Sequence, residues 1–259
     1  MIKNFQLKDD LDQEKVEAIT NAWSLSENKV FHLKSNISCD QVRSFYESVG
    51  KKIGKLHHLA EDISKGDRDN QRTNEIWMEV RYDSKFPDAY RHSSNPQPLH
   101  TDGSYIKSYP NSTLMCCVAN SAVGGETIFL KTEDLVKILE TKDKKLLEFL
   151  LTNEILHERS GDSTKKKIIE MNDGHYKINF NYHCVSKKNS QSTLDYVDQF
   201  FKFINKSKDV KEKTKAVKLK VGDAVFWKDA EVLHGRNGFV PTKDSDRFIW
   251  KCAIEILEK

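Results

Sequence analysis

His100 and Asp102 lie two residues apart within residues 96–105, and this spacing restricts how the chain can fold around them. On an extended backbone, residues i and i+2 project from the same face. An imidazole nitrogen and a carboxylate oxygen then converge and supply two ligands of a two-histidine, one-carboxylate triad, which leaves open positions on iron(II). His-x-Asp also arises by chance, so this interpretation requires a third ligand and a scaffold elsewhere in the chain.

A second segment, residues 222–236, has the pattern expected of a third ligand on a strand. Gly222 and Asp223 favour a turn, residues 224–227 form an apolar run, and His234 precedes Gly235. A core or turn histidine with an ordinary hydrogen bond is the commoner reading of a lone histidine, and that alternative stays open here.

Arg247 is the first residue of an apolar segment that runs to Ile256. Arginine on a buried strand is unusual unless an anion pairs with it. Its planar guanidinium suits a dicarboxylate co-substrate. A neighbouring Asp or Glu would satisfy it equally well.

Apolar segments of strand length alternate with a few helical segments, without the regular βαβ order of a parallel sheet. Asn172, Asp173 and Gly174 predict a hairpin turn, and Asp40 is the expected N-cap of a helix through Val49. Other helices are expected at 11–23 and 193–204, with two successive helices between 132 and about 151. Strands are expected at 29–33, 76–80, 113–119, 127–131, 216–221, 224–227 and 248–256. The pattern fits one domain, 1–259, mainly β with flanking helices: a double-stranded β-helix (jelly-roll, cupin-like) core at roughly 76–259 with the N-terminal helices and strand packed on it.

Charge and composition exclude several classes of protein. The net charge of +3, from 42 basic and 39 acidic residues, is too small to indicate a nucleic-acid or membrane surface. No apolar run approaches the ~20 residues of a membrane span, and residues 1–14 lack the apolar region of a signal peptide. The five cysteines are odd in number and form no Cys-x-x-Cys pair, so we expect reduced, mostly buried thiols in the cytoplasm.

Together these segments resemble the iron(II)/2-oxoglutarate-dependent dioxygenases of the taurine dioxygenase / clavaminate synthase-like family. The resemblance covers residues 98–252 and rests on Pro98-Leu-His-Thr-Asp-Gly-Ser-Tyr105, Gly124-Gly-Glu-Thr127, Leu233-His-Gly-Arg236 and Asp246-Arg247. It implies that His100, Asp102 and His234 bind iron(II). It also implies that Thr127 hydrogen-bonds the distal carboxylate of 2-oxoglutarate and that Arg247 pairs with that carboxylate.

The resemblance further implies the reaction. With O2, 2-oxoglutarate is converted to succinate and CO2 while an unactivated C–H of a small molecule, such as an amino acid or a specialised metabolite, is hydroxylated. Desaturation and cyclisation are alternatives, and Asp102 disfavours halogenation because related halogenases have a small residue there. Outside this class, the alternatives are a catalytically inactive jelly-roll protein that binds or senses a ligand, and a hydrolytic zinc protein that leaves Thr127 and Arg247 unexplained.

Three further residues are candidates for contact with the substrate. Lys251 stands where many relatives have a second arginine for an acidic substrate group, and on a strand it shares a face with Arg247. It either binds a substrate anion less rigidly or forms a structural ion pair. Arg236 and Tyr105 lie beside ligands, where they contact substrate or only support the ligands. The remaining histidines, apart from His183, are expected at the surface: His32, His57, His58, His92, His157 and His175.

Overall fold

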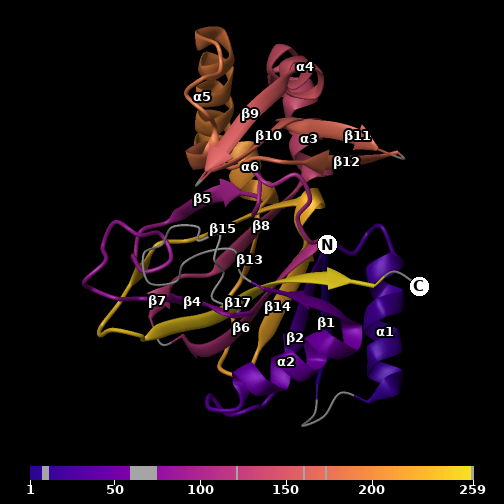
Figure 1. The fold of residues 1–259 in the computed structure, drawn as a ribbon, viewed down its shortest axis with the longest axis vertical. Helices are drawn as coiled ribbons and strands as arrows, with labels where there is room; N and C mark the ends of the chain where they lie inside the picture. The colour runs from indigo at the N-terminus through magenta and orange to yellow at the C-terminus, as the bar shows by residue number, and fades with distance from the viewer. Residues whose placement is uncertain (8–11, 59–74, 121, 160, 173, 258–259) are drawn as a thin grey trace.

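The computed structural model describes residues 1–7, 12–58, 75–120, 122–159, 161–172 and 174–257 (Figure 1). Its largest sheet has seven strands, and the strands along its main path are β1 (Ile2–Gln6), β2 (Val30–Lys34), β14 (Ala224–Lys228), β6 (Ser112–Asn120), β17 (Arg247–Ile256) and β3 (Gly54–His57). Strand β4 (Met78–Arg81) also pairs with β17. The β1–β2 pair is parallel and the other pairs are antiparallel. The N-terminal strands therefore extend the same sheet as the central ones.

A second, four-stranded sheet faces the first. Its order is β13 (Lys215–Val217), β8 (Thr127–Lys131), β15 (Val232–Arg236) and β5 (Gln97–His100), and all pairs are antiparallel. Inward-facing side chains of both sheets form one core between them, including Met115 and Ile249 from the large sheet and Phe129 and Val232 from the small one. A short pair, β7 (Val123–Gly124) with β16 (Phe239–Val240), lies beside this core.

Helices cover the outer faces of both sheets (Figure 1). Helices α1 (Gln13–Ser24) and α2 (Val42–Ile53) pack against the large sheet around Trp23, Phe31 and Phe226. The small sheet is covered by α3 (Thr132–Lys142), α4 (Lys144–Thr152), α5 (Gln191–Lys206) and α6 (Lys208–Lys213), together with the hairpins β9 (Glu154–Arg159)–β10 (Asp162–Lys167) and β11 (Ile169–Asn172)–β12 (His175–Ile178). Two 3-10 turns, Tyr182–Cys184 and Asp229–Glu231, complete the elements.

The predicted mainly β architecture with flanking helices is confirmed, and the strands expected at 113–119, 127–131, 224–227 and 248–256 agree with β6, β8, β14 and β17 to within a residue at each end. The N-cap prediction at Asp40 is wrong. Helix α2 begins at Val42, and Gln41 occupies the cap position without a side-chain hydrogen bond. The segment 38–41 forms a turn instead, in which the Gln41 amide donates to the Ser38 carbonyl.

Two histidines expected at the surface are buried, so that prediction is wrong for them. His157 on β9 is fully buried, and its Nδ1 lies 3.2 Å from the carbonyl oxygen of Ile155. His32 on β2 is buried and its Nε2 lies 3.0 Å from Oδ2 of Asp223. Their strands become internal only when other layers cover them, which short-range sequence pattern does not show. In the described part of the chain, no helix is both long and apolar enough to cross a bilayer.

Candidate active site

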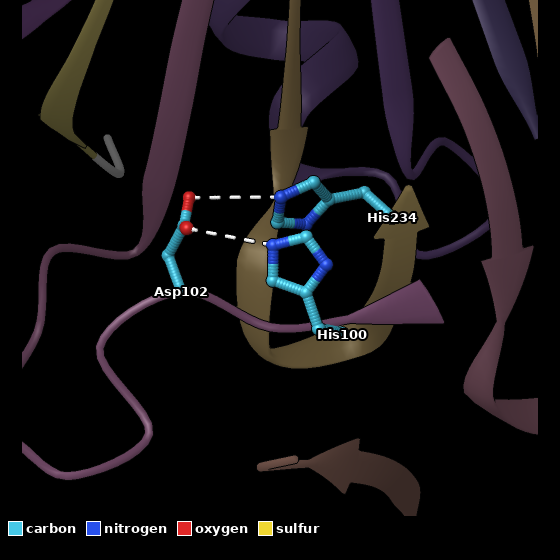
Figure 2. A group of neighbouring side chains, drawn as sticks. All are labelled: His100, Asp102 and His234. Carbon is cyan, nitrogen blue, oxygen red and sulfur yellow. Dashed lines mark ion pairs between the residues drawn. The ribbon is translucent and has the colours of Figure 1, made fainter. Parts of the chain in front are cut away.

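Three side chains, His100, Asp102 and His234, converge between the two sheets (Figure 2). Their ligand atoms all lie within 4.8 Å of one another. The Nε2 atoms of His100 and His234 lie 3.9 and 3.7 Å from the Asp102 carboxylate. The two histidines are direct neighbours across the antiparallel β5–β15 pair, so sheet register brings them together although they are far apart in sequence.

The local reason for the convergence differs from the one expected. Strand β5 ends at His100, and Asp102 lies in the turn that follows. This turn continues through Gly103, whose φ of +57° places it in the left-handed region that glycine favours. A Cβ at this position would lie 2.3 Å from the ring of Tyr109. The carboxylate therefore approaches the imidazole because the chain turns, whereas the expected mechanism was two side chains on one strand face.

Hydrogen bonds orient the histidine rings. Nδ1 of His100 lies 2.8 Å from the Pro98 carbonyl oxygen. This assigns the proton to Nδ1 and leaves the Nε2 lone pair directed at Asp102. Nδ1 of His234 is buried without a hydrogen bond and lies 3.7 Å from Oδ1 of Asp229.

Asp229 organises the site and was not identified from the sequence. Its carboxylate accepts a hydrogen bond from the indole of Trp227 at 2.9 Å and from the backbone amide of Asp102 at 3.2 Å. It thereby connects β14, the turn at Asp102 and the ring of His234. Burial and the neighbouring Asp102 raise its pKa well above the usual range. In the sequence, Asp229 stands between an apolar strand and the candidate histidine, which could have drawn attention to it. Nothing in the sequence, however, indicates that its side chain points toward the site.

The environment favours neutral imidazoles and an ionised carboxylate. Burial lowers the pKa of His100, and it lowers the pKa of His234 well below the ordinary value. Burial acts to raise the pKa of Asp102, but the ammonium of Lys251 and the two histidines outweigh it and hold that pKa well below its usual range. Because divalent metals bind neutral imidazole and carboxylate, this donor set fits an iron(II) ion.

Lys251 and Thr113 reach Asp102 from the large sheet. Nζ of Lys251 lies 2.8 Å from Oδ1 and 2.7 Å from Oδ2 of Asp102, and the Thr113 hydroxyl donates to Oδ2 at 3.0 Å. Strands β17 and β6 are neighbours, so both contacts come from the inward face of one sheet. The ion pair of Lys251 with Asp102 is present in this structure, and contact of Lys251 with a substrate anion stays a prediction.

Arg247 is the first residue of β17 and Thr127 is the first residue of β8. Both are buried, and Nε of Arg247 donates to the Gly125 carbonyl at 3.2 Å. Burial lowers the Arg247 pKa to about 10, so the guanidinium is charged at neutral pH. Within the described residues it forms no salt bridge with a carboxylate. Gly125 has a φ of +74°, and a Cβ there would lie 3.1 Å from the Arg247 side chain, so this glycine is required for the close approach.

Arg236 is buried and bound to a loop. Its guanidinium donates to the carbonyls of Tyr90, Ser93 and Asn95 at 3.1, 2.8 and 2.6 Å. Arg236 therefore holds the loop between β4 and β5 in place, and its contact with substrate stays a prediction. Tyr105 is also buried, in the turn after Asp102.

A mainly β scaffold that holds two histidines and one carboxylate within ligand distance is typical of the non-haem iron(II) oxygenases. Residues 2–253 match the model of the taurine catabolism dioxygenase TauD, TfdA family, and the chain belongs to this family. The resemblance inferred from the sequence is thereby confirmed. The predicted enzyme class and its cofactors, iron(II), 2-oxoglutarate and O2, are those of this family.

Individual proteins similar to this chain share its fold. An asparagine oxygenase in complex with Fe(II), 3-hydroxyasparagine and succinate is 10% identical and superimposes with a TM-score of 0.67 over 95% of this chain and 84% of its own. The non-haem iron oxygenase OrfP, in complex with Fe and alpha-ketoglutaric acid, is 11% identical. It superimposes with a TM-score of 0.66 over 95% of this chain and 80% of its own. A uridine-5'-phosphate dioxygenase from Streptomyces sp. is 25% identical over 174 residues, which span 61% of this chain and 61% of that protein.

Proposed function

We propose that this protein is an iron(II)- and 2-oxoglutarate-dependent oxygenase in which His100, Asp102 and His234 bind the metal. The observation that carries the proposal is the convergence of their ligand atoms within 4.8 Å in a buried site. Bound iron(II) supplies the chemistry that couples oxidative decarboxylation of 2-oxoglutarate by O2 to oxidation of a substrate C–H. The protein keeps the imidazoles neutral and oriented, keeps Asp102 ionised, and surrounds the site with the apolar core between the sheets.

Arg247 and Thr127 are the proposed anchor for 2-oxoglutarate. A buried, charged guanidinium without a carboxylate partner in the described structure calls for an anion, because an unpaired buried charge is costly. The distal carboxylate of 2-oxoglutarate supplies that anion, and the Thr127 hydroxyl supplies a further hydrogen bond. Because Gly125 has no Cβ, it leaves room for the Arg247 side chain. A hydrolytic zinc protein would have no function for Arg247 and Thr127.

The proposed reaction is hydroxylation of a small molecule, such as an amino acid or a specialised metabolite, with release of succinate and CO2. Support comes from the family match and from the similarity of the fold to that of an asparagine oxygenase. The carboxylate of Asp102 disfavours halogenation. Desaturation and cyclisation use the same metal site and are distinguished only by the product. The alternative, an inactive protein that binds or senses a ligand, would have been favoured by loss of any triad residue.

We further propose that the two facing sheets form a jelly-roll (double-stranded β-helix) core within a single domain, and that the enzyme is cytoplasmic. Support for the core is the antiparallel order of the four-stranded sheet and its shared interior with the large sheet. Support for a reducing compartment is that Cys116, Cys117 and Cys252 are buried thiols that form no disulfide. With a net charge of +3, no nucleic-acid or membrane partner is proposed.

Anaerobic titration of the metal-free protein with iron(II) and 2-oxoglutarate tests the function. We expect the visible absorption of an iron–2-oxoglutarate chelate in the wild type, its absence in His100→Ala, and its retention in the control His175→Ala, whose histidine is exposed on β12. Under O2 the wild type should convert 2-oxoglutarate to succinate. A folded, metal-loaded protein without the absorption or the turnover would favour the inactive alternative.

A further inference from the structure

A cavity of about 430 Å³ lies directly beside the metal-binding carboxylate. Thr101, Asp102 and Gly103 form one side of its lining, and Asp229 forms another part. Its volume falls in the range of roughly 300–1,000 Å³ that is usual for small-molecule sites. The cavity and the triad share Asp102, whereas His100 and His234 do not belong to the cavity lining.

Four lysines line this cavity. Lys107 follows the turn at Asp102, Lys166 and Lys167 end strand β10, and Lys177 lies on β12. The lining also contains three acids: Asp102, which is paired with Lys251, Asp229, which accepts hydrogen bonds from Trp227 and the Asp102 amide, and Glu170. Away from the metal site, the described lining therefore includes four lysines and one glutamate.

Lys166 is the most constrained of the four. Its side chain is half-buried, and Nζ donates to the Ile106 carbonyl at 3.0 Å, which joins β10 to the loop on the other side of the cavity. An ammonium has three N–H donors, so this bond leaves two for a ligand. The preceding Lys165 is exposed and does not line the cavity.

We infer that this cavity receives the phosphate group of a small phosphomonoester substrate, and this inference rests on the proposed function. Lysine is a point-charge donor suited to phosphate, whereas carboxylates are commonly held by the planar fork of arginine, and the cavity lining contains no arginine. A phosphate dianion balances the excess of ammonium groups. The carbon atoms attached to it then extend along the cavity toward Asp102.

The sequence relative is consistent with this class of substrate. The uridine-5'-phosphate dioxygenase from Streptomyces sp. is named for a phosphomonoester. The inference specifies no particular base or sugar, because only the phosphate group is proposed to bind the lysines of the cavity. An amino acid without a phosphate is the competing outcome.

The test measures binding to the protein loaded anaerobically with iron(II) and 2-oxoglutarate. Uridine 5'-phosphate and glycerol 3-phosphate serve as phosphomonoester probes in calorimetric titrations, with uridine, glycerol and L-asparagine as probes without phosphate. We expect at least one phosphomonoester to bind at least tenfold more tightly than its dephosphorylated counterpart. Equal binding of both members of each pair, or tighter binding of L-asparagine, would overturn the inference.

Matched variants locate the binding. Lys166→Gln combined with Lys177→Gln should weaken phosphomonoester binding at least tenfold, while Lys165→Gln combined with Lys187→Gln, at exposed positions outside the lining, should change it less than twofold. Circular dichroism checks that both pairs fold. An equal effect of the two pairs would exclude this cavity. Absence of the chelate absorption counts against the proposed function, whereas weak phosphomonoester binding with the chelate intact counts against the cavity alone.

Discussion

The Nζ atom of Lys251 lies 2.7 and 2.8 Å from the two carboxylate oxygens of Asp102, and it connects the large sheet to the turn that holds the proposed metal ligand. Both side chains are only 15% exposed, so water screens this pair weakly. The ammonium keeps Asp102 ionised and also places a positive charge close to the position of a second cation. The ion pair therefore stabilises the folded protein and weakens the binding of a metal cation.

Asp102→Ala should abolish metal binding and turnover, and it should also lower the free energy of unfolding by about 3 kcal/mol because Lys251 is left buried without its partner. Replacing the pair with apolar residues, Asp102→Ala with Lys251→Met, should recover most of that stability without recovering activity. Urea unfolding and succinate formation measure the two effects separately. Activity in the stable double variant would remove Asp102 from the ligand set.

Lys251→Met alone should strengthen binding of a divalent metal by about tenfold, or about 1.4 kcal/mol, because it removes a cation adjacent to the ligand carboxylate. Mn(II), which is stable in air, is a suitable probe for calorimetric titration. The metal-free variant should meanwhile be less stable than the wild type. Weaker metal binding would instead show that Lys251 is needed to hold Asp102 in its ligand geometry.

Arg247→Ala should weaken 2-oxoglutarate binding by about 2–5 kcal/mol, as expected for loss of one partner of a desolvated charge pair. Arg247→Lys keeps the charge without the planar fork and should lose less. Titrating 2-oxoglutarate into the iron-loaded variants gives the affinities. If Arg247→Ala bound the co-substrate as tightly as the wild type, another residue would be its anchor.

Arg236→Ala should lower the free energy of unfolding by about 3 kcal/mol, because three carbonyls of the loop between β4 and β5 lose charged hydrogen bonds. The loss should be seen without substrate or co-substrate present. An unchanged urea midpoint together with a raised KM would indicate that Arg236 contacts the substrate instead.

His157 predicts a loss of stability in acid. Burial lowers its pKa to about 4 from an ordinary 6.5, so the unfolded chain binds the proton first as the pH falls. The stabilisation is fully present above pH 6.5 and is lost progressively down to about pH 4, by about 3 kcal/mol in total. His157→Gln should remove this part of the pH dependence of urea unfolding, and the exposed control His175→Gln should leave it in place.

The strands of the core were predictable because their signals are short-range. The apolar runs around Cys116 and Phe226 have the length and composition of buried strands, and both form strands. Gly174 lies between β11 and β12 and has a φ of +79°, as expected for a residue of a hairpin turn. The Asp40 cap failed because Ser38 and Gln41 hydrogen-bond to each other and form a turn before the helix begins. The prediction that His157 lies at the surface failed because its neighbours come from other parts of the chain, such as Val185, which forms a β-bridge with it.

The sequence by itself determined the chemical groups of the site and their order: His100 and Asp102, then Thr127, His234 and Arg247. Side-chain type and spacing indicated candidate iron donors, and the family resemblance added Thr127 and Arg247 as candidate donors for a dicarboxylate. Only the tertiary structure decided which groups meet. The pairing of β5 with β15 aligns the two histidines, and the packing of the two sheets brings Lys251 to Asp102. Such contacts depend on register and on layers far apart in sequence, where no local pattern carries the information.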